Sequence, residues 1–114
     1  MDGRILRKEI YWADLNPIRG KEQGGIRPVL VVSNNIFNQR SGTTVILAIT
    51  SVKPRVKYPL VLELDCLSLP KRSWVKITQI RTISNDRVGN YIGQINTQQM
   101  NEILAAINDL IGED

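Results

Sequence analysis

Short apolar runs rich in β-branched residues recur along the chain, and each ends at a cluster of Gly, Pro, Asn, Asp or Ser. Runs of this length, bounded by turn-forming residues, are typical of strands rather than helices. The pattern therefore predicts five to seven short strands, with one short helical turn at 36–40. The runs are residues 9–15, 27–33, 43–50, 60–64, 73–83 and 88–95.

The last part of the chain has a helical period instead. Its apolar residues recur every three or four positions and form one stripe, made of Met100, Ile103, Leu104, Ile107, Leu110 and Ile111. Asn96 or Thr97 can act as the N-cap, Gln99 can complete a capping box with Asn96, and Gly112 follows the stripe. We expect a helix over 96–111.

Several short strands followed by one late helix predict an α+β fold that is mainly β. The expected form is a small, strongly bent antiparallel sheet or partly open barrel, with the helix packed against it. The 114 residues fit a single domain, 1–114. Residues 1–8 are predicted to be a polar arm with little to anchor it.

The composition excludes several kinds of site. The chain has no histidine, so a Ser–His–Asp triad, a Cys–His pair and a histidine-based zinc site are ruled out, and no metal site is expected. The single cysteine, Cys66, cannot form an internal disulfide. The sequence has neither an apolar stretch near 18 residues nor an N-terminal apolar segment typical of a secretory signal, so we expect a cytoplasmic protein without a membrane span.

The net charge is +4, and two loops that each follow a predicted strand, 17–26 and 52–58, are both basic. If both loops lie at one end of the barrel, they form a cationic groove suited to a phosphate backbone; otherwise they are solvated loop charges. With six aromatic residues in total, a base-stacking platform has weak support, and Trp12 and Trp74 are expected in the core or on a dimer surface.

Residues 20–35 join a polar, glycine-containing loop to a buried strand. The apolar run from Val29 to Val32 follows directly, and Arg27 stands at the junction. Pro28 favours an extended backbone at Arg27. A cation held at the mouth of a buried strand can present its guanidinium to an anion.

These residues also carry a resemblance. Residues 10–17 (IYWADLNP) and 20–34 (GKEQGGIRPVLVVSN) resemble the opening of the MazF/PemK family of toxin endoribonucleases. The segments Ile49-Thr50-Ser51 and Gln79-Ile80-Arg81-Thr82-Ile83 resemble the second and third motifs of that family. The likeness extends from about residue 9 to residue 110.

The resemblance implies an SH3-like barrel with a C-terminal helix, a homodimer, and cleavage of single-stranded RNA without metal or cofactor. It also implies a partner antitoxin whose flexible acidic segment blocks the groove. Attack by a ribose 2′-hydroxyl would give a cyclic phosphate or a 3′-phosphate, together with a 5′-hydroxyl end. Two rival functions are a non-catalytic RNA- or antitoxin-binding relative and a gyrase poison like CcdB, which acts through a C-terminal tryptophan that residues 110–114 lack.

By the same resemblance, Arg27 matches the catalytic arginine, Thr50 the catalytic hydroxyl, and Glu22 a loop acid that is a candidate base or else a solvated charge. Some PemK-type relatives use an arginine and an aspartate where this chain has Lys76 and Thr78, so the identity of the base stays open. Gln79 and Arg81 either line the groove or satisfy backbone groups. The candidate RNA-binding residues are Arg19, Lys21, Gln23, Asn34, Lys53, Arg55, Lys57, Gln79 and Arg81.

Overall fold

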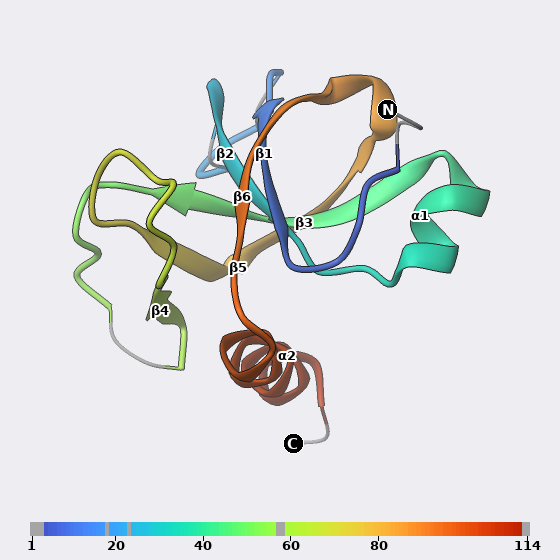
Figure 1. Ribbon diagram of the computed structural model, residues 1–114. Coiled ribbons are helices and arrows are strands. Elements are labelled where there is room, and N and C mark those ends of the chain that lie inside the picture. The colour runs from blue at the N-terminus through green and yellow to red at the C-terminus, as the bar shows by residue number, and fades with distance from the viewer. Residues whose placement is uncertain (1–3, 18, 23, 57–58, 113–114) are drawn as a thin grey trace.

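The computed structural model describes residues 4–17, 19–22, 24–56 and 59–112. They form six strands, two α-helices and one 3₁₀ turn (Figure 1). In chain order the elements are β1 (Glu9–Asp14), β2 (Ile26–Val31), α1 (Asn35–Ser41), β3 (Thr43–Thr50), β4 (Val61–Glu63), β5 (Trp74–Ser84), η1 (Asn85–Arg87), β6 (Val88–Gln94) and α2 (Thr97–Ile111). Each predicted strand is present, within two residues of its expected bounds.

The strands make one antiparallel sheet in the order β4-β5-β3-β2-β1-β6. The sheet is not closed, because β4 and β6 are its two edges. The predicted mainly β fold with an open, barrel-like sheet and a C-terminal helix is therefore confirmed. In Figure 1 the sheet lies above α2, with α1 at one end and β4 at the other.

A large irregularity in β5 bends the sheet. On β3, Leu47 pairs with Ile80, while Ile49, two positions further, pairs with Val75, five positions back along β5. The additional residues of β5 form a bulge, which turns its first half away so that it can also pair with β4. This bend brings the β4 edge and its loops toward the end of β3.

The sheet buries an apolar core on each face. One core lies between the sheet and α2 and includes Leu30, Leu47, Ile77 and Ile103, all with no exposed surface. The other covers the opposite face and includes Leu15, Val29 and Ile46. Because side chains alternate along a strand, neighbouring residues of β2 and β3 contribute to opposite cores. The helical stripe predicted for α2 supplies buried residues to the first core.

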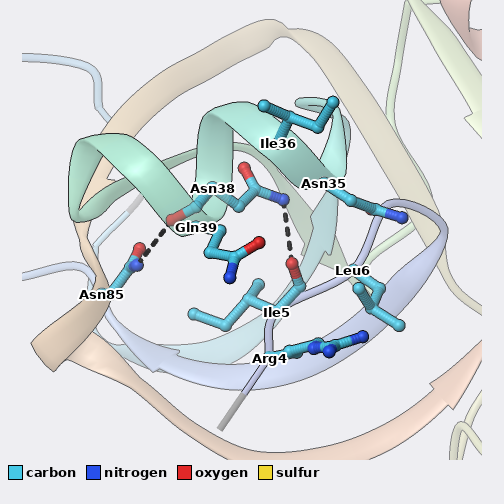
Figure 2. Close-up of a pocket in the computed structure, with 8 residues that line it drawn as sticks. All are labelled: Arg4, Ile5, Leu6, Asn35, Ile36, Asn38, Gln39 and Asn85. Carbon is cyan, nitrogen blue, oxygen red and sulfur yellow. Dashed lines mark hydrogen bonds between the residues drawn. The ribbon is translucent and has the colours of Figure 1, made fainter.

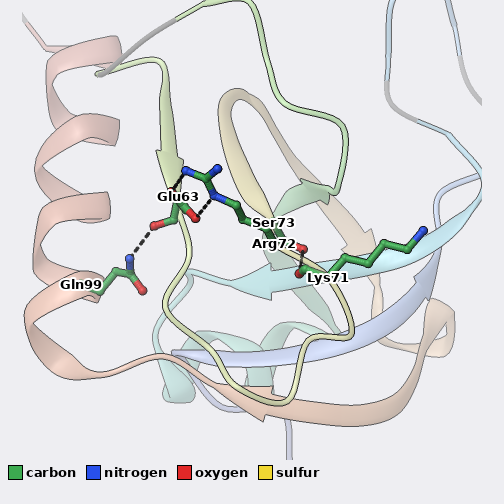
Figure 3. A network of polar contacts seen from close by, with 5 residues as sticks. All are labelled: Glu63, Lys71, Arg72, Ser73 and Gln99. Carbon is green, nitrogen blue, oxygen red and sulfur yellow. Dashed lines mark hydrogen bonds and ion pairs between the residues drawn. The ribbon is translucent and has the colours of Figure 1, made fainter.

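The start of α2 differs in part from the predicted capping box. The Asn96 side chain does cap the helix, since it accepts a hydrogen bond from the backbone N–H of Gln99. The Gln99 side chain does not return to Asn96. Its amide donates to the carbonyl of Glu63 and accepts from the N–H of Asp65, so that it pairs with the end of β4 as a short strand would (Figure 3).

The described part of the N-terminal arm, residues 4–8, is well anchored, so the expectation that little holds it is wrong. Arg7 donates its backbone N–H to Asn35 Oδ1 and its Nε–H to the carbonyl of Val32. The N–H of Lys8 donates to Val31, and its carbonyl accepts from Ile95. These partners lie far along the chain, and a polar arm gives no sequence signal for such bonds. Within the described residues, no helix is long and apolar enough to cross a membrane.

Candidate active site

Two of the predicted catalytic residues are neighbours at one end of the sheet. Arg27 lies at the start of β2 and Thr50 at the end of β3. The two strands are paired as far as Val29 opposite Ala48, and extending this register by two residues sets Arg27 opposite Thr50. Opposed residues of an antiparallel pair project from the same face, with their Cβ atoms about 5 Å apart. The sequence therefore brings a guanidinium and a hydroxyl together from positions that are far apart in the chain.

Arg27 is held in place by the loop before it. Its Nε–H donates to the carbonyl of Gly24 at 2.7 Å, which fixes the side chain relative to the β1–β2 loop. The side chain is half-buried, and burial lowers the pKa of Arg27 below its ordinary value. The guanidinium remains a cation near neutral pH, because arginine starts from a very high pKa. Its remaining N–H groups are suited to binding two oxygens of a phosphate.

Thr50 is buried, with 6% of its surface exposed. Its Oγ1 accepts a hydrogen bond from the backbone N–H of Val52 at 3.1 Å, which closes a small turn after β3. A hydroxyl that accepts one hydrogen bond still has its own hydrogen to donate. Thr50 can therefore donate to an oxygen atom of a ligand while its position is fixed by the backbone.

Arg27 and Thr50 border one pocket, with a volume of about 440 Å³. The loop between β4 and β5 forms one wall, through Leu69, Pro70, Lys71 and Ser73. The other lining residues are Trp12, Pro28, Ile49, Ser51 and Val52. The pocket combines an apolar wall with a few polar groups, as is typical of ligand sites.

The pocket residues that were not sequence candidates include an aromatic ring and a second cation. Trp12 lines the pocket and is 39% exposed, so of its two expected positions the core is wrong and the dimer surface stays a prediction. Lys71 adds a second cation. It lies in a turn that shows no motif, and its place in the pocket depends on the bend of β5, which the sequence does not reveal. Lys71 could have been suspected from its charge alone.

The β1–β2 loop places its charged residues outside this pocket. Arg19, Lys21 and Glu22 are all exposed. The carboxylate of Glu22 accepts a hydrogen bond from the backbone N–H of Arg19 at 2.7 Å, so it stabilises a turn within the loop. Glu22 is not among the residues that line the Arg27 pocket. Gln23 lies outside the described residues.

The second basic loop borders a separate hollow of about 360 Å³. Lys53 and Arg55 line it on one side, and Glu63 of β4 and Trp74 of β5 on the other; its remaining lining residues are Pro54, Val56 and Val61. Because Trp74 pairs with Thr50 across β3 and β5, this hollow lies next to the Arg27–Thr50 pair. Lys57 lies outside the described residues.

In the third motif, residues 79–83, one side chain binds a backbone carbonyl. Arg81 is half-buried and donates from Nη1 to the carbonyl of Leu15 at 3.2 Å, which ties β5 to the end of β1. Gln79 lies in the irregular part of β5, where the pairing with β3 shifts. The sequence left open whether this pair lines a groove or satisfies backbone groups. Arg81 does bind a backbone carbonyl, and its contact with RNA stays a prediction.

Asn34 has a structural role at the other end of β2. Its Oδ1 accepts a hydrogen bond from the backbone N–H of Phe37 and so caps α1. Seven residues of extended chain separate it from Arg27, or about 20 Å. The structure thus does not bring Asn34 to the candidate site.

Among the described residues, no three Cys, Asp or Glu side chains come close enough together to hold a metal ion. The polar groups gathered at the Arg27 pocket are cations and hydroxyls, which bind anions rather than metal cations. The chemistry of the pocket is that of an anion site with a hydrogen-bond donor beside it.

Comparison with known families agrees with this geometry. A family model described as the PemK-like, MazF-like toxin of type II toxin–antitoxin systems matches residues 6–111. The chain belongs to this family. It is similar to Endoribonuclease EndoA of Bacillus subtilis, with 36% identity over 90% of each chain. It is also similar to Endoribonuclease MazF of Staphylococcus saprophyticus, with 35% identity over 95% of this chain and 92% of that one.

Solved structures of the MazF-like family have the same fold. MazF of Deinococcus radiodurans superposes with a TM-score of 0.84 over 96% of this chain and 98% of that chain, at 22% identity. A mycobacterial endoribonuclease, solved in complex with its cognate antitoxin, gives a TM-score of 0.77 at 28% identity over 96% of this chain and 97% of that one. The open six-stranded sheet with its C-terminal helix is thus the fold of these toxins.

Proposed function

We propose that the chain is the toxin of a type II toxin–antitoxin system and an endoribonuclease that cleaves single-stranded RNA at the Arg27–Thr50 site. The observation that carries this proposal is the juxtaposition of Arg27 and Thr50 across β2 and β3, beside a pocket large enough for a nucleotide. Two curated relatives at 35–36% identity are named endoribonucleases, which supports the same reaction. By cleaving messenger RNA the protein would stop translation and growth.

The proposed reaction is attack of a ribose 2′-hydroxyl on the adjacent phosphorus, with departure of the 5′-oxygen. It leaves a 2′,3′-cyclic phosphate, which can open to a 3′-phosphate, and a 5′-hydroxyl end. Negative charge develops on the phosphoryl oxygens, and a cation fixed in advance stabilises it. Arg27 supplies this cation because its bond to Gly24 orients the guanidinium before substrate arrives.

Arg27 can also give a proton to the leaving oxygen, since burial lowers its pKa. The Thr50 hydroxyl donates to a phosphoryl oxygen or orients the 2′-hydroxyl. Glu22 stays the candidate base. For that role its carboxylate would have to leave the backbone N–H of Arg19, which requires the β1–β2 loop to rearrange on RNA binding.

The proposal includes three partners. RNA would lie along the cationic residues at this end of the sheet, among them Lys53, Arg55 and Lys71. A cognate antitoxin with an acidic, flexible segment would compete for the same charges, in line with the mycobacterial relative solved with its antitoxin. We further propose that the chain works as a homodimer in the cytoplasm.

The test is cleavage of a long RNA by the purified protein in the presence of EDTA, with mapping of the new ends. We expect cuts at a short recurring sequence, with 5′-hydroxyl ends on one fragment and cyclic or 3′-phosphate on the other. Thr50→Val is the matched variant, because it keeps the shape of the side chain and removes the hydroxyl. Its rate should fall roughly 10- to 100-fold, as for the loss of one hydrogen bond to a charged group.

Two results would overturn the assignment. One is an RNA that stays intact with the wild-type protein. The other is equal cleavage by the wild type and by Thr50→Val, which would place the activity elsewhere or in a contaminant.

A further inference from the structure

The row of paired residues that contains Thr50 continues across the sheet beyond the proposed cleavage site. Thr50 of β3 pairs with Trp74 of β5, and Trp74 pairs with Glu63 of β4. Paired residues project from the same face, so the three side chains lie in line with Arg27. Trp74 is about 10 Å from Arg27, two strand spacings away. A side chain at that place is within reach of a nucleotide next to the cleaved bond.

Trp74 and Glu63 form the floor of the hollow described above. The loop that contains Lys53 and Arg55 borders it from the other side. Its volume of about 360 Å³ falls within the range of small-ligand pockets, ~300–1000 Å³. The hollow is thus lined by an aromatic ring, a carboxylate and two cations, and neither Arg27 nor Thr50 lines it.

Arg72 fixes the two floor residues from outside the hollow. Its guanidinium lies 5.2 Å from the centroid of the Trp74 ring. It also binds both carboxylate oxygens of Glu63, at 2.5 and 2.9 Å (Figure 3). Arg72 is not among the residues that line the hollow. Its stacking therefore orients the indole and leaves the hollow open.

The contact with Arg72 also keeps the Glu63 carboxyl ionised. Its hydrogen bonds with Arg72 lower the pKa of the Glu63 carboxyl, so it remains an acceptor well below neutral pH. The backbone carbonyl of Glu63 is bound by Gln99, which fixes the strand that carries the carboxylate. Each carboxylate oxygen has a second lone pair that Arg72 does not use.

We infer that this hollow is a nucleobase subsite, in which a base flanking the cleaved bond stacks on Trp74 and donates its amino group to Glu63. Single-stranded RNA is recognised by this combination of aromatic stacking and hydrogen bonds to the base edge. Adenine, cytosine and guanine each carry an amino group; uracil has none, and its one edge donor, N3–H, lies between two carbonyl oxygens that a carboxylate repels. The subsite accordingly selects against uracil. Lys53 and Arg55 would bind the phosphates on either side.

The inference rests on the proposed ribonuclease function, so the experiment separates the two. Cleavage sites on a long RNA of balanced composition are mapped for the wild type, Glu63→Gln, Trp74→Leu and Trp74→Phe. An amide both donates and accepts, so Glu63→Gln should admit uracil at one flanking position. We expect discrimination against uracil to fall roughly 5- to 150-fold there, the range for one base contact.

The tryptophan variants test the stacking. Trp74→Leu should weaken binding of an uncleavable RNA by roughly 5- to 150-fold, and Trp74→Phe should restore most of it because an aromatic face is kept. Thermal melting of each variant shows whether it is folded. Phe37→Leu is the matched control, since Phe37 is an aromatic residue, 38% exposed, on α1 at the opposite end of the sheet, and its loss should change neither property.

An unchanged base preference in Glu63→Gln, in a protein that cuts RNA normally, would overturn the subsite and leave the proposed function standing. If the wild type does not cut RNA, the proposed ribonuclease function is wrong, and the subsite is then tested by the binding of oligonucleotides. Oligocytidine would then have to bind more tightly than oligouridine in the wild type and not in Glu63→Gln. Equal binding of the two by the wild type would overturn the subsite as well.

Discussion

Two pockets of nearly equal size lie at opposite ends of this sheet. The Arg27 pocket has a volume of about 440 Å³, and the pocket beneath α1 and the N-terminal arm, which we call the arm pocket, about 430 Å³. The arm pocket is lined by Arg4, Ile5, Leu6, Asn35, Ile36, Asn38, Gln39 and Asn85 (Figure 2). Size therefore does not distinguish a functional site from a structural one here.

The difference lies in how the polar groups are used. In the arm pocket, Asn38 is buried, its amide donates to the carbonyls of Ile5 and Ser33, and its oxygen accepts from the Ser33 hydroxyl. Asn85 donates to the carbonyl of Asn38 and accepts from the Thr44 hydroxyl. These groups bind one another across α1, the arm and η1. At the Arg27 pocket the guanidinium uses only its Nε–H, and the Thr50 hydroxyl only accepts, in the hydrogen bonds described above, so both retain donors for a ligand.

The comparison predicts opposite effects of truncation at the two ends. Arg27→Ala should lower the RNA cleavage rate by ~10²–10³-fold, as for loss of one donor to a developing oxyanion. The melting temperature should change little, because the Arg27 side chain makes one hydrogen bond within the described part of the chain, to the carbonyl of Gly24. Single-turnover cleavage and thermal melting on the same preparation check both. A variant that melts early and cuts normally would reverse the roles of the two pockets.

Asn38→Ala is the counterpart at the arm pocket. It leaves several buried partners without hydrogen bonds, at a cost of roughly 2–4 kcal/mol in the free energy of unfolding. That corresponds to a melting temperature lower by roughly 10 °C or more. Below that temperature the cleavage rate per folded molecule should equal that of the wild type. A selective loss of cleavage in a stable Asn38→Ala protein would contradict a purely structural arm pocket.

Charge removal should also separate the two ends. Binding of single-stranded RNA weakens with salt, and the slope of log affinity against log salt is about −0.7 for each phosphate contacted. Lys71→Gln should reduce the steepness of this slope by about 0.7 if Lys71 contacts one phosphate. Arg40→Gln removes an exposed cation in the last turn of α1 and should leave the slope unchanged. Equal slopes for the wild type, Lys71→Gln and Arg40→Gln would show that Lys71 does not contact a phosphate of the RNA.

The smallest effect is expected at Tyr11, which supports the arm. Burial and a hydrogen bond to Glu9 raise the pKa of Tyr11 above its ordinary value. A raised pKa of this acid stabilises the fold below pH ~10, and the stabilisation is lost as the pH rises above that value, because the unfolded chain ionises first. Tyr11→Phe should cost about 1 kcal/mol at neutral pH and weaken this alkaline loss. Chemical denaturation at pH 7 and pH 11 measures both, and an unaltered alkaline loss would show that Tyr11 does not cause it.

Local sequence patterns predicted the features that do not depend on contacts between distant parts of the chain. Alternation gave the strands, the apolar stripe gave α2, and Asn96 was identified as a possible cap. The strands, the helix and its cap rest on spacing along one segment. Arg27 and Thr50 were picked out by the resemblance of two separate motifs to the MazF/PemK family, and the register of β2 and β3 places both strand ends together.

Features that depend on the bend of β5 were out of reach. The bulge between Ile80 and Val75 brings Lys71 to the Arg27 pocket and Trp74 beside Thr50. The sequence of β5 does not indicate how many of its residues bulge out, because this number depends on how β5 pairs with β3 and β4 at the same time. Gln99 likewise has the local signal of a capping box, and the proximity of β4 overrides it. The anchored arm also depends on contacts between distant parts of the chain, whereas the Asn34 cap is a local contact with Phe37.

The most direct test of the central claim is where RNA binds. An RNA with 2′-O-methyl groups throughout has no free 2′-hydroxyl and is not cleaved, and its effect on each backbone amide can be followed by NMR. The account predicts the largest shifts at Arg27, Thr50, Val52 and Lys71, with small ones from Asn35 to Asn38. Shifts concentrated at the arm pocket, with Arg27 and Thr50 unaffected, would contradict it.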